Sequence, residues 1–354
     1  MEKLKLAIAG TGHFANVHLD NYLDMPDVEI VGVLGGQSRE RTEEFASRAG
    51  ACAYFDYAQM LRDSGCKAVA IVSPDSFHKE QAITALRAGI HVLCEKPLAL
   101  TYADTQEMEE EARKSGAVNM VNFSLRQQPT ISKAKRLIDE GIIGELRYFE
   151  ANFLQGWLVS QKRGDWRTDS KWLWRLSKEH GGYGALHDVG CHILDSVSML
   201  TGDITKLYCK LPVYHKADGD RIGEYKLDAN DSSLIMATTD NGTVGNISIT
   251  RWATGNINSI YIRLSGTKGA LRIGFDTYFD GACLEVCVGA NNVDEAVWEQ
   301  VHCEAEASLY RQFVDAAKEG RQHSPDFRRG SYVQGLLEAC NISNDENREV
   351  DLLS

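Results

Sequence analysis

The sequence predicts an α/β protein with an N-terminal doubly wound parallel sheet and a C-terminal α+β domain that contains a mostly antiparallel open sheet. Up to residue 121, short apolar runs alternate with helix-forming stretches, the pattern of parallel strands joined by helices. The run at 68–72 is apolar throughout, as expected for a strand buried on both faces of a sheet. From residue 203, strand-like runs are separated by turn signals such as Asp240-Asn241-Gly242, which is typical of an antiparallel sheet.

The apolar periodicity places each element in order. In the first part we expect strands at 4–9, 28–34, 68–72, 91–94 and 118–121, and helices at 39–49, 77–88 and 103–115. In the second part we expect a helix at 129–140, a strand at 146–153, a helix at 185–200 and closing helices at 307–319 and 327–341. The chain then divides into domains 1–122 and 123–354, and the closing helices can pack back on the first domain.

Composition excludes several classes of protein. With 38 basic and 50 acidic residues the formal net charge is -12, so the basic surface that nucleic acid requires is not expected. No run approaches the roughly 18 apolar residues of a membrane span, and the first apolar run is too short for a signal peptide. Nine scattered cysteines fit a reduced, cytoplasmic protein. Cys283 and Cys287 could form half of a metal site, but no second pair follows, so no metal is expected.

A glycine-rich turn follows the first predicted strand. Residues 10–15 read G-x-G-x-x-A and open a helix, which is the context required of a dinucleotide-binding Rossmann domain. Gly10 permits the tight turn, Gly12 lets the backbone approach a pyrophosphate, and the helix N-terminus supplies N–H donors. We therefore expect Gly10, Gly12, His13 and Phe14 to contact a cofactor, with His13 a loop residue rather than a catalyst.

The loop after the second predicted strand bears on which cofactor is bound. An NAD-specific domain usually has Asp or Glu here for the ribose hydroxyls, whereas this chain has Gly35-Gly36 and then Ser38 and Arg39. A hydroxyl and a guanidinium suit a 2′-phosphate, so the expected cofactor is NAD(P), with NADP favoured. The alternative is that Arg39 is only a solvated residue on a helix surface.

Glu95-Lys96-Pro97 closes a predicted strand at the carboxyl edge of the parallel sheet, where ligands of open α/β sheets bind. Here the chain resembles the Gfo/Idh/MocA oxidoreductases over nearly its whole length, through residues 10–15, Ser73-Pro74-Asp75 with His78, Glu95-Lys96-Pro97, 181–192 and 324–327. The resemblance implies that Lys96 lies beside the nicotinamide and the reacting alcohol. The cofactor contacts that it implies or supports are Ser73, Pro74, His78, Glu95, Lys96 and Arg126.

A second motif begins at Gly181-Gly182-Tyr183-Gly184 and leads to Asp188 and His192. These two residues are four apart on a predicted helix, so they project from one face. Spacing alone allows a surface pair or an internal hydrogen-bonded pair. The resemblance implies that Asp188 and His192 are catalytic together with Lys96.

Tryptophans surround a possible sugar site. The stretches 153–157 and 172–175 are similar to those of family members that oxidise glycosides and anhydrosugars. Aromatic faces suit a pyranose, so Trp157, Trp174 and Arg175 are expected to contact substrate, as are Lys96, Asp188 and His192. The alternative is that the tryptophans belong to the core or to a subunit interface.

We interpret the sequence as an NAD(P)-dependent sugar or polyol dehydrogenase. His192 would take the hydroxyl proton, Lys96 would tune the charge of the site, and Asp188 would orient the substrate. Domain 123–354 would bind the substrate and form a homodimer or homotetramer, because the sequence provides helices for only one face of its sheet. Two alternatives remain open: a redox-neutral glycosidase or sugar–sugar oxidoreductase that retains its cofactor, and a non-catalytic nucleotide- or sugar-sensing regulatory protein.

Overall fold

The structure is a computed structural model that describes residues 2–36, 38–162, 164–181, 183–276 and 279–352. Gly182, part of the second predicted motif, lies outside these ranges. The chain forms two compact units, Met1–Ser124 with Ala307–Gln334, and Leu125–Glu306 with Gly335–Ser354.

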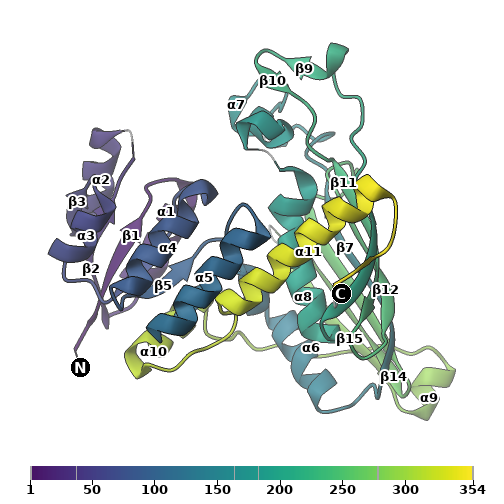
Figure 1. Cartoon of the computed structure of the whole chain (residues 1–354). Coiled ribbons are helices and arrows are strands. Elements are labelled where there is room, and N and C mark those ends of the chain that lie inside the picture. The colour runs from purple at the N-terminus through teal and green to yellow at the C-terminus, as the bar shows by residue number, and fades with distance from the viewer. Residues whose placement is uncertain (1, 37, 163, 182, 277–278, 353–354) are drawn as a thin grey trace. The chain divides into compact units, whose positions relative to one another are not determined.

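A six-stranded parallel sheet forms the centre of the first unit (Figure 1). Its strands are β1 Leu4–Ala9, β2 Val28–Leu34, β3 Cys52–Tyr54, β4 Ala68–Ile71, β5 His91–Cys94 and β6 Asn119–Val121. The order β3-β2-β1-β4-β5-β6 reverses direction between β1 and β4, and every pairing is parallel. The predicted doubly wound sheet is therefore confirmed, and the carboxyl ends of β1 and β4 flank the point where such sheets bind ligands.

Helices connect these strands and complete the core of the first unit. They are α1 His13–Leu23, α2 Arg39–Ala49, α3 Tyr57–Asp63, the 3₁₀ turn η1 Asp75–Phe77, α4 His78–Arg87, α5 Tyr102–Ser115, α10 Leu309–Glu319 and the first part of α11 Phe327–Glu346. Phe313 of α10 shares one hydrophobic cluster with Leu6 and Ile8 of β1. Arg311, on the same helix, donates to Asp27 before β2 at 2.7 Å. The closing helix α10 is thus part of the first unit.

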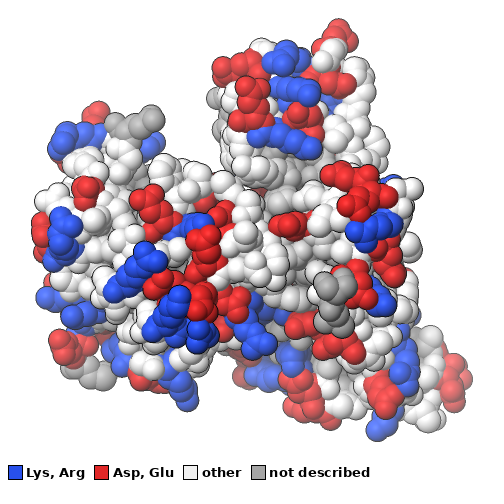
Figure 2. Space-filling model, in the orientation of Figure 1, with Lys and Arg blue, Asp and Glu red and all other residues white. Residues whose placement is uncertain are grey.

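Several charged side chains on α4 and α5 of the first unit form ion pairs. Lys79 of α4 lies 2.7 Å from Asp104 and 2.9 Å from Glu107 of α5. Arg87 contacts Glu111 at 2.9 Å. On the face seen in Figure 2, basic and acidic side chains are accordingly interspersed along α5.

A nine-stranded sheet forms the second unit, in the order β16-β15-β14-β13-β7-β12-β11-β8-β17. Its strands are β7 Leu146–Gln155, β8 Ile204–Lys210, β11 Ser232–Thr239, β12 Val244–Thr250, β13 Asn258–Gly266, β14 Gly269–Asp276, β15 Phe279–Val288, β16 Glu299–Gln300 and β17 Val350–Asp351. Among the described pairings β7 and β12 run parallel and the others antiparallel. The predicted mostly antiparallel sheet is confirmed.

Helices lie along one face of this sheet (Figure 1): α6 Pro129–Asp139, α8 Cys191–Thr201 and the C-terminal part of α11. Phe149, Ala151 and Phe153 of β7 are buried, in agreement with a strand that covers a core on alternate residues. On the other face, large apolar side chains stay exposed on neighbouring strands. These are Tyr148, Leu234, Met236, Val244 and Tyr261.

Shorter elements lie between the strands. They are α7 Ser170–Leu173, the 3₁₀ turns η2 Ser124–Gln127, η3 Trp174–Leu176, η4 Lys178–His180 and η6 Asp218–Asp220, the hairpin β9 Arg221–Ile222 with β10 Tyr225–Lys226, and α9 Ala290–Asp294. Residues of α7, η3 and the β9–β10 hairpin pack with Trp157, Trp166 and Leu227 in a second, smaller hydrophobic cluster. Within the described ranges no helix is long and apolar enough to span a bilayer.

The predicted helix at 185–200 is not a single α-helix. Leu186–Gly190 forms a π-helical turn, η5, and α8 follows from Cys191. Gly184 precedes this turn with φ +84°, and a Cβ there would lie 1.8 Å from Asn230 Oδ1. Only glycine fits at that position, so the chain can enter the turn close to the start of β11.

Candidate active site

The turn after β1 has an open helix N-terminus. Gly10 has φ +127°, and a Cβ there would lie 2.5 Å from the carbonyl oxygen of Val72, so only glycine fits. Gly12 is the N-cap of α1, and the first turn has neither a side-chain cap nor an acidic residue. A Cβ on Gly12 would meet no other atom within 4 Å. His13 and Phe14 are exposed in this first turn. These features fit a pyrophosphate group at the N-terminus of α1.

The loop after β2 has no carboxylate close to the strand end. Ser38 caps α2, because its Oγ accepts a hydrogen bond from the Arg41 backbone N–H at 3.3 Å. The Arg39 guanidinium lies 4.2 Å from the centre of the Phe55 ring and 3.3 Å from Glu43 Oε1. Arg39 is exposed, so its cationic group is accessible at the start of α2.

His78 holds two predicted cofactor segments together. Its side chain is buried, and its ring nitrogens lie 3.0 Å from the carbonyl oxygens of Ser73 and Pro97. Ser73 donates through Oγ to Gln81 at 2.7 Å. Pro74 is exposed at the end of the same loop. His78 therefore positions Ser73 and the segment after Lys96 through backbone contacts.

Glu95 anchors the end of β5 in a polar network that sequence reasoning missed. Its Oε1 lies 2.8 Å from His18 Nε2 and accepts from Asn122 at 2.6 Å. Its Oε2 accepts from the backbone N–H of Lys96 at 3.2 Å. Burial alone would raise the pKa of Glu95, but hydrogen bonds from His18 and Asn122 and the charges of His18 and Lys96 lower it to about 2. The carboxylate thus holds the strand end from which the half-buried Lys96 projects.

Burial also affects the tyrosine in this network. Tyr310 of α10 accepts a hydrogen bond from Asn122 at 3.2 Å. Desolvation and, to a smaller extent, the negative charge of Glu95 raise the pKa of Tyr310 to about 12, although the hydrogen bond from Asn122 lowers it. Tyr310 stays a neutral phenol, so the network keeps one carboxylate charge, on Glu95.

Asp188 and His192 lie on consecutive turns in the second unit. Asp188 is in the π-helical turn η5, and His192 is the second residue of α8. A π-helix has more residues per turn than the 3.6 of an α-helix, so residues four apart are more nearly in line. Both side chains are half-buried. The common face of Asp188 and His192 stays a prediction, now for a π-helical turn followed by an α-helix rather than for a single α-helix.

Two arginines hold the Asp188 carboxylate. Arg175 Nη1 donates to Asp188 Oδ2 at 3.3 Å, and Arg251 Nη2 donates to the same oxygen at 3.1 Å. Arg251 was not predicted, because a lone arginine after a strand gives no local signal. Two cationic donors favour the ionised form of a carboxylate.

The two tryptophans expected at the sugar site lie in different surroundings. Trp157 is buried, its ring is stacked on Trp172 at 5.1 Å, and its Nε1 donates to Gln155 at 3.1 Å. Trp174 is 37% exposed, with the Arg175 guanidinium 4.7 Å from its ring centre. Trp174 thus presents an aromatic surface that a ligand can reach, whereas Trp157 is mainly part of the packing.

Arg126 is tied to the helix that carries His192. Its Nε and Nη2 each donate to the Asp195 carboxylate at 2.7 Å, and Asp195 is buried on α8. Such a two-pronged contact fixes a guanidinium in orientation. Asp195 was missed, although its spacing of seven from Asp188 and three from His192 is a helical signal.

His187 provides a prediction about stability. Burial, assisted by the positive charge of Lys178, lowers the pKa of His187 from 6.5 to about 4. The contribution of neutral His187 to the free energy of unfolding is fully present above about pH 6.5 and is lost as the pH falls towards 4. At 1.36 kcal/mol per pKa unit, this amounts to about 2 kcal/mol after allowance for partial exposure.

Replacement of His187 by asparagine is expected to flatten the pH dependence of the free energy of unfolding between pH 6.5 and 4. All six tryptophans lie between residues 157 and 298, so urea unfolding followed by tryptophan fluorescence reports on the second unit. An unchanged difference in stability between pH 7 and pH 4.5 would contradict this prediction.

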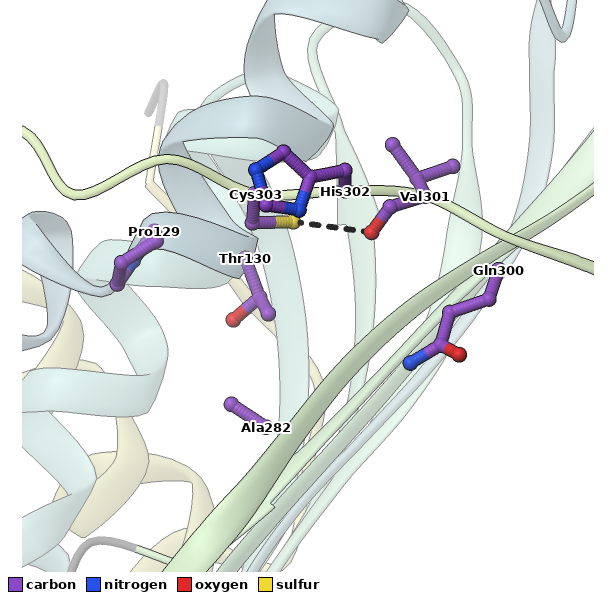
Figure 3. A pocket seen from close by; sticks show the side chains of 7 residues that line it. All are labelled: Pro129, Thr130, Ala282, Gln300, Val301, His302 and Cys303. Carbon is purple, nitrogen blue, oxygen red and sulfur yellow. Dashed lines mark hydrogen bonds between the residues drawn. The ribbon is translucent and has the colours of Figure 1, made fainter.

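A pocket elsewhere in the second unit contains none of the predicted site residues (Figure 3). It has a volume of about 460 Å³, and Thr130 of α6 faces His302 and Cys303 there. Burial raises the pKa of Cys303 against the opposing charges of Lys133 and Arg136, and its thiol donates to the Val301 carbonyl oxygen at 3.5 Å. This thiol is not activated as a nucleophile, so the pocket is a weaker candidate for chemistry.

Comparison with known proteins identifies the family. Residues 4–123 match the family model of oxidoreductases with an NAD-binding Rossmann fold, and residues 131–272 match the GFO/IDH/MocA C-terminal domain. Levoglucosan dehydrogenase of Pseudarthrobacter phenanthrenivorans is 27% identical over 324 residues, which cover 85% of this chain and 80% of that protein. The NADP(+)-named scyllo-inositol 2-dehydrogenase of Bacillus subtilis is 35% identical over 200 residues, covering 56% of this chain and 58% of the relative.

Solved structures agree with the fold. Levoglucosan dehydrogenase in complex with NADH and levoglucosan superposes with a TM-score of 0.85 at 26% identity, covering 100% of both chains. An oxidoreductase domain protein from Kribbella flavida gives a TM-score of 0.86 at 27% identity, covering 99% of this chain and 100% of the other. The chain belongs to the GFO/IDH/MocA family of oxidoreductases, with an NAD-binding Rossmann fold in its N-terminal part.

Proposed function

We propose that the protein is an NAD(P)-dependent dehydrogenase that oxidises a secondary alcohol of a sugar, glycoside or polyol. The observation that carries this proposal is the surroundings of Asp188. Its carboxylate is held by Arg175 and Arg251, and one turn later α8 presents His192. A fixed carboxylate, a neighbouring imidazole and an exposed aromatic face at Trp174 suit a polyhydroxylated ring. The relatives named for levoglucosan and scyllo-inositol also act on such compounds.

The first unit provides a fitting place for the cofactor. The uncapped N-terminus of α1 and the space at Gly12 would accept the pyrophosphate. When bound, the nicotinamide supplies the acceptor for the hydride from the substrate carbon. Ser73, Pro74, Glu95 and Arg126 would contact or position it, with His78 supporting the loop.

The chain's own residues would perform the proton chemistry. His192 takes the proton of the reacting hydroxyl as general base. Asp188 accepts a hydrogen bond from a neighbouring hydroxyl and so fixes which carbon reacts, and Arg175 adds a donor at the same place. Lys96, held at the end of β5 by the Glu95 network, keeps a positive charge near the developing alkoxide.

We further propose that NADP is preferred over NAD. The support comes from the exposed Arg39 guanidinium, a cationic donor that suits a 2′-phosphate at the start of α2. Glu40 in the first turn of α2 and the Arg39–Glu43 pair oppose this preference. The balance favours NADP, because no carboxylate occupies the usual ribose position at Gly35-Gly36.

Absorbance at 340 nm tests both proposals. NAD⁺ and NADP⁺ are offered separately with pyranoses, glycosides, anhydrosugars and inositols. We expect reduction with one substrate class and a higher kcat/KM for NADP⁺, which Arg39→Ala should reduce. Equal or better use of NAD⁺ contradicts the cofactor preference. If no compound of the panel is oxidised although the protein binds the cofactor, redox-neutral sugar chemistry is favoured. If no compound is oxidised and no cofactor binds, a sensor is favoured.

The open face of the nine-stranded sheet supports a proposal about assembly. Large apolar side chains are exposed on four successive strands of this face: Leu234 and Met236 on β11, Val244 on β12, Tyr148 on β7 and Tyr261 on β13. Exposed apolar side chains that recur across a sheet face in this way suit a protein interface. We propose a homodimer or homotetramer through this face, and light scattering of the protein and of a Met236→Asp variant would measure the mass. A monomeric wild type would contradict it.

A further inference from the structure

Arg251 contacts three separate segments of the second unit. It follows β12 directly, and its residue is 1% exposed. Its Nη2 donates to Asp188 in η5, and its Nη1 donates to the Arg175 carbonyl oxygen in η3, both at 3.1 Å. Its guanidinium carbon lies 5.1 Å from the centre of the Trp157 ring, in the segment after β7. One buried side chain thus joins the segments of Asp188 and Arg175, which carry proposed substrate contacts, to the segment of Trp157.

We propose that Arg251 is a positioning residue that sets the arrangement of Asp188, Arg175 and Trp157 at the proposed substrate site. This inference rests on the proposed function, which assigns Asp188 and Arg175 to the substrate, whereas Trp157 packs beside them. Arg251 acts through them and need not touch the substrate itself. Its place is fixed by the sheet, since the last residue of β12, Thr250, pairs with Leu154 of β7.

The chemistry of the side chain supports this role over simple packing. A guanidinium is planar and offers donors in a fixed fork, so two acceptors from different segments can be held at one relative position. An ammonium at the same place would be a point charge without this fork. The face of the Trp157 ring lies within range of a cation–π contact, which adds a third constraint.

The charges around Arg251 pair it with the Asp188 carboxylate. Burial lowers the pKa of Arg251, the negative charge of Asp188 opposes this, and the nearby Arg175 lowers it further. Asp231 also attracts Arg251, but it lies 2.7 Å from the buried Lys216 and is largely neutralised by it. His192 lies one turn beyond Asp188 on α8. Among these described groups of the second unit, Asp188 is the carboxylate that balances Arg251 directly.

Two substitutions separate the parts of this role. Arg251→Lys keeps the charge and loses the fork, whereas Arg251→Gln keeps a planar donor and loses the charge. We expect kcat/KM for the best sugar to fall about 10-fold in the Lys variant and about 100-fold in the Gln variant, because small displacements of positioning groups cost this much. The acid limb of the pH profile of kcat/KM should stay in place in the Lys variant. In the Gln variant it should move to higher pH, because Asp188 loses a neighbouring positive charge.

Matched controls use an arginine with similar local contacts outside this cluster. Arg167 lies 4.6 Å over the Trp166 ring and 3.5 Å from Asp165, but it is 50% exposed. Arg167→Lys and Arg167→Gln should leave kcat/KM within about twofold. The dissociation constant of the reduced cofactor, measured by the fluorescence of its nicotinamide, should stay unchanged in all four variants. The proposed contacts of the cofactor lie mainly in the first unit.

Unchanged kcat/KM in Arg251→Lys would overturn the proposal, even if Arg251→Gln failed to fold. Equal losses in both variants without a shift of the acid limb would also overturn it, because they indicate packing alone. A turnover-free measurement separates this inference from the proposed function. The exciton signal of the stacked Trp157–Trp172 pair in circular dichroism should weaken in the Gln variant. If the exciton signal persists in the Gln variant, the proposed role of Arg251 is overturned. If the wild type has no dehydrogenase activity but the signal still weakens in the Gln variant, only the proposed dehydrogenase function is overturned.

Discussion

Replacement of His192 by alanine is expected to lower kcat by about 10²–10⁴-fold, the usual contribution of a positioned general base. His192 lies one turn beyond Asp188 at the start of α8, whose next turns are buried among core residues. The helix therefore has a scaffold that loss of one half-buried ring should not disturb. Steady-state kinetics on the best sugar measure kcat, and nicotinamide fluorescence should give a cofactor dissociation constant within about twofold of the wild-type value.

His187→Gln is the matched control for this substitution. His187 lies on the same segment, but its pKa of about 4 keeps it neutral at the pH of the assay, and it contacts Asn341 at 3.3 Å. We expect this variant to retain kcat. If His192→Ala and Lys96→Ala both kept near-normal turnover, the assignment of the catalytic residues would be wrong.

The fold was predictable to the extent that burial is periodic along the chain. The bounds of β1, β2 and β5 agree with the predicted strands, since these strands are apolar runs with helices on both sides. The segment containing β3 and α3 was missed. Cys52–Tyr54 is a three-residue strand with partly exposed side chains at the sheet edge, and so short a strand leaves little hydrophobic pattern.

The candidate site was predictable where its residues form local motifs. Gly10, Gly12 and Lys96 lie in short segments whose chemistry depends on their own turn or strand end. Arg251 contacts Asp188 across 63 positions, and its place depends on the parallel pairing of β12 with β7. His18 likewise reaches Glu95 across 77 positions. Such contacts follow from strand register and helix docking, which a single sequence does not specify.

The second large effect concerns a buried ion pair that supports this part of the fold. Lys216 Nζ lies 2.7 Å from Asp231 Oδ2, and both side chains are fully buried. The same carboxylate oxygen accepts the Tyr214 backbone N–H at 2.8 Å, and Lys216 donates to the Tyr214 carbonyl oxygen at 2.9 Å. The pair therefore ties the segment before the β9–β10 hairpin to the start of β11.

Lys216→Met and Asp231→Asn are each expected to lower the free energy of unfolding of the second unit by about 3–5 kcal/mol, because each leaves one buried charge without its partner. The double variant should recover more than half of that loss, since no uncompensated charge remains and asparagine can still accept the Tyr214 N–H. Urea unfolding followed by tryptophan fluorescence measures all three. Losses below about 1 kcal/mol in the single variants, or strictly additive losses in the double variant, would mean that water reaches the pair and screens it.

The Asp231 backbone carbonyl also accepts the Arg251 backbone N–H at 3.0 Å, which connects the ion pair to the proposed substrate site. We therefore expect kcat/KM to fall together with stability in the single variants and to return in the double variant.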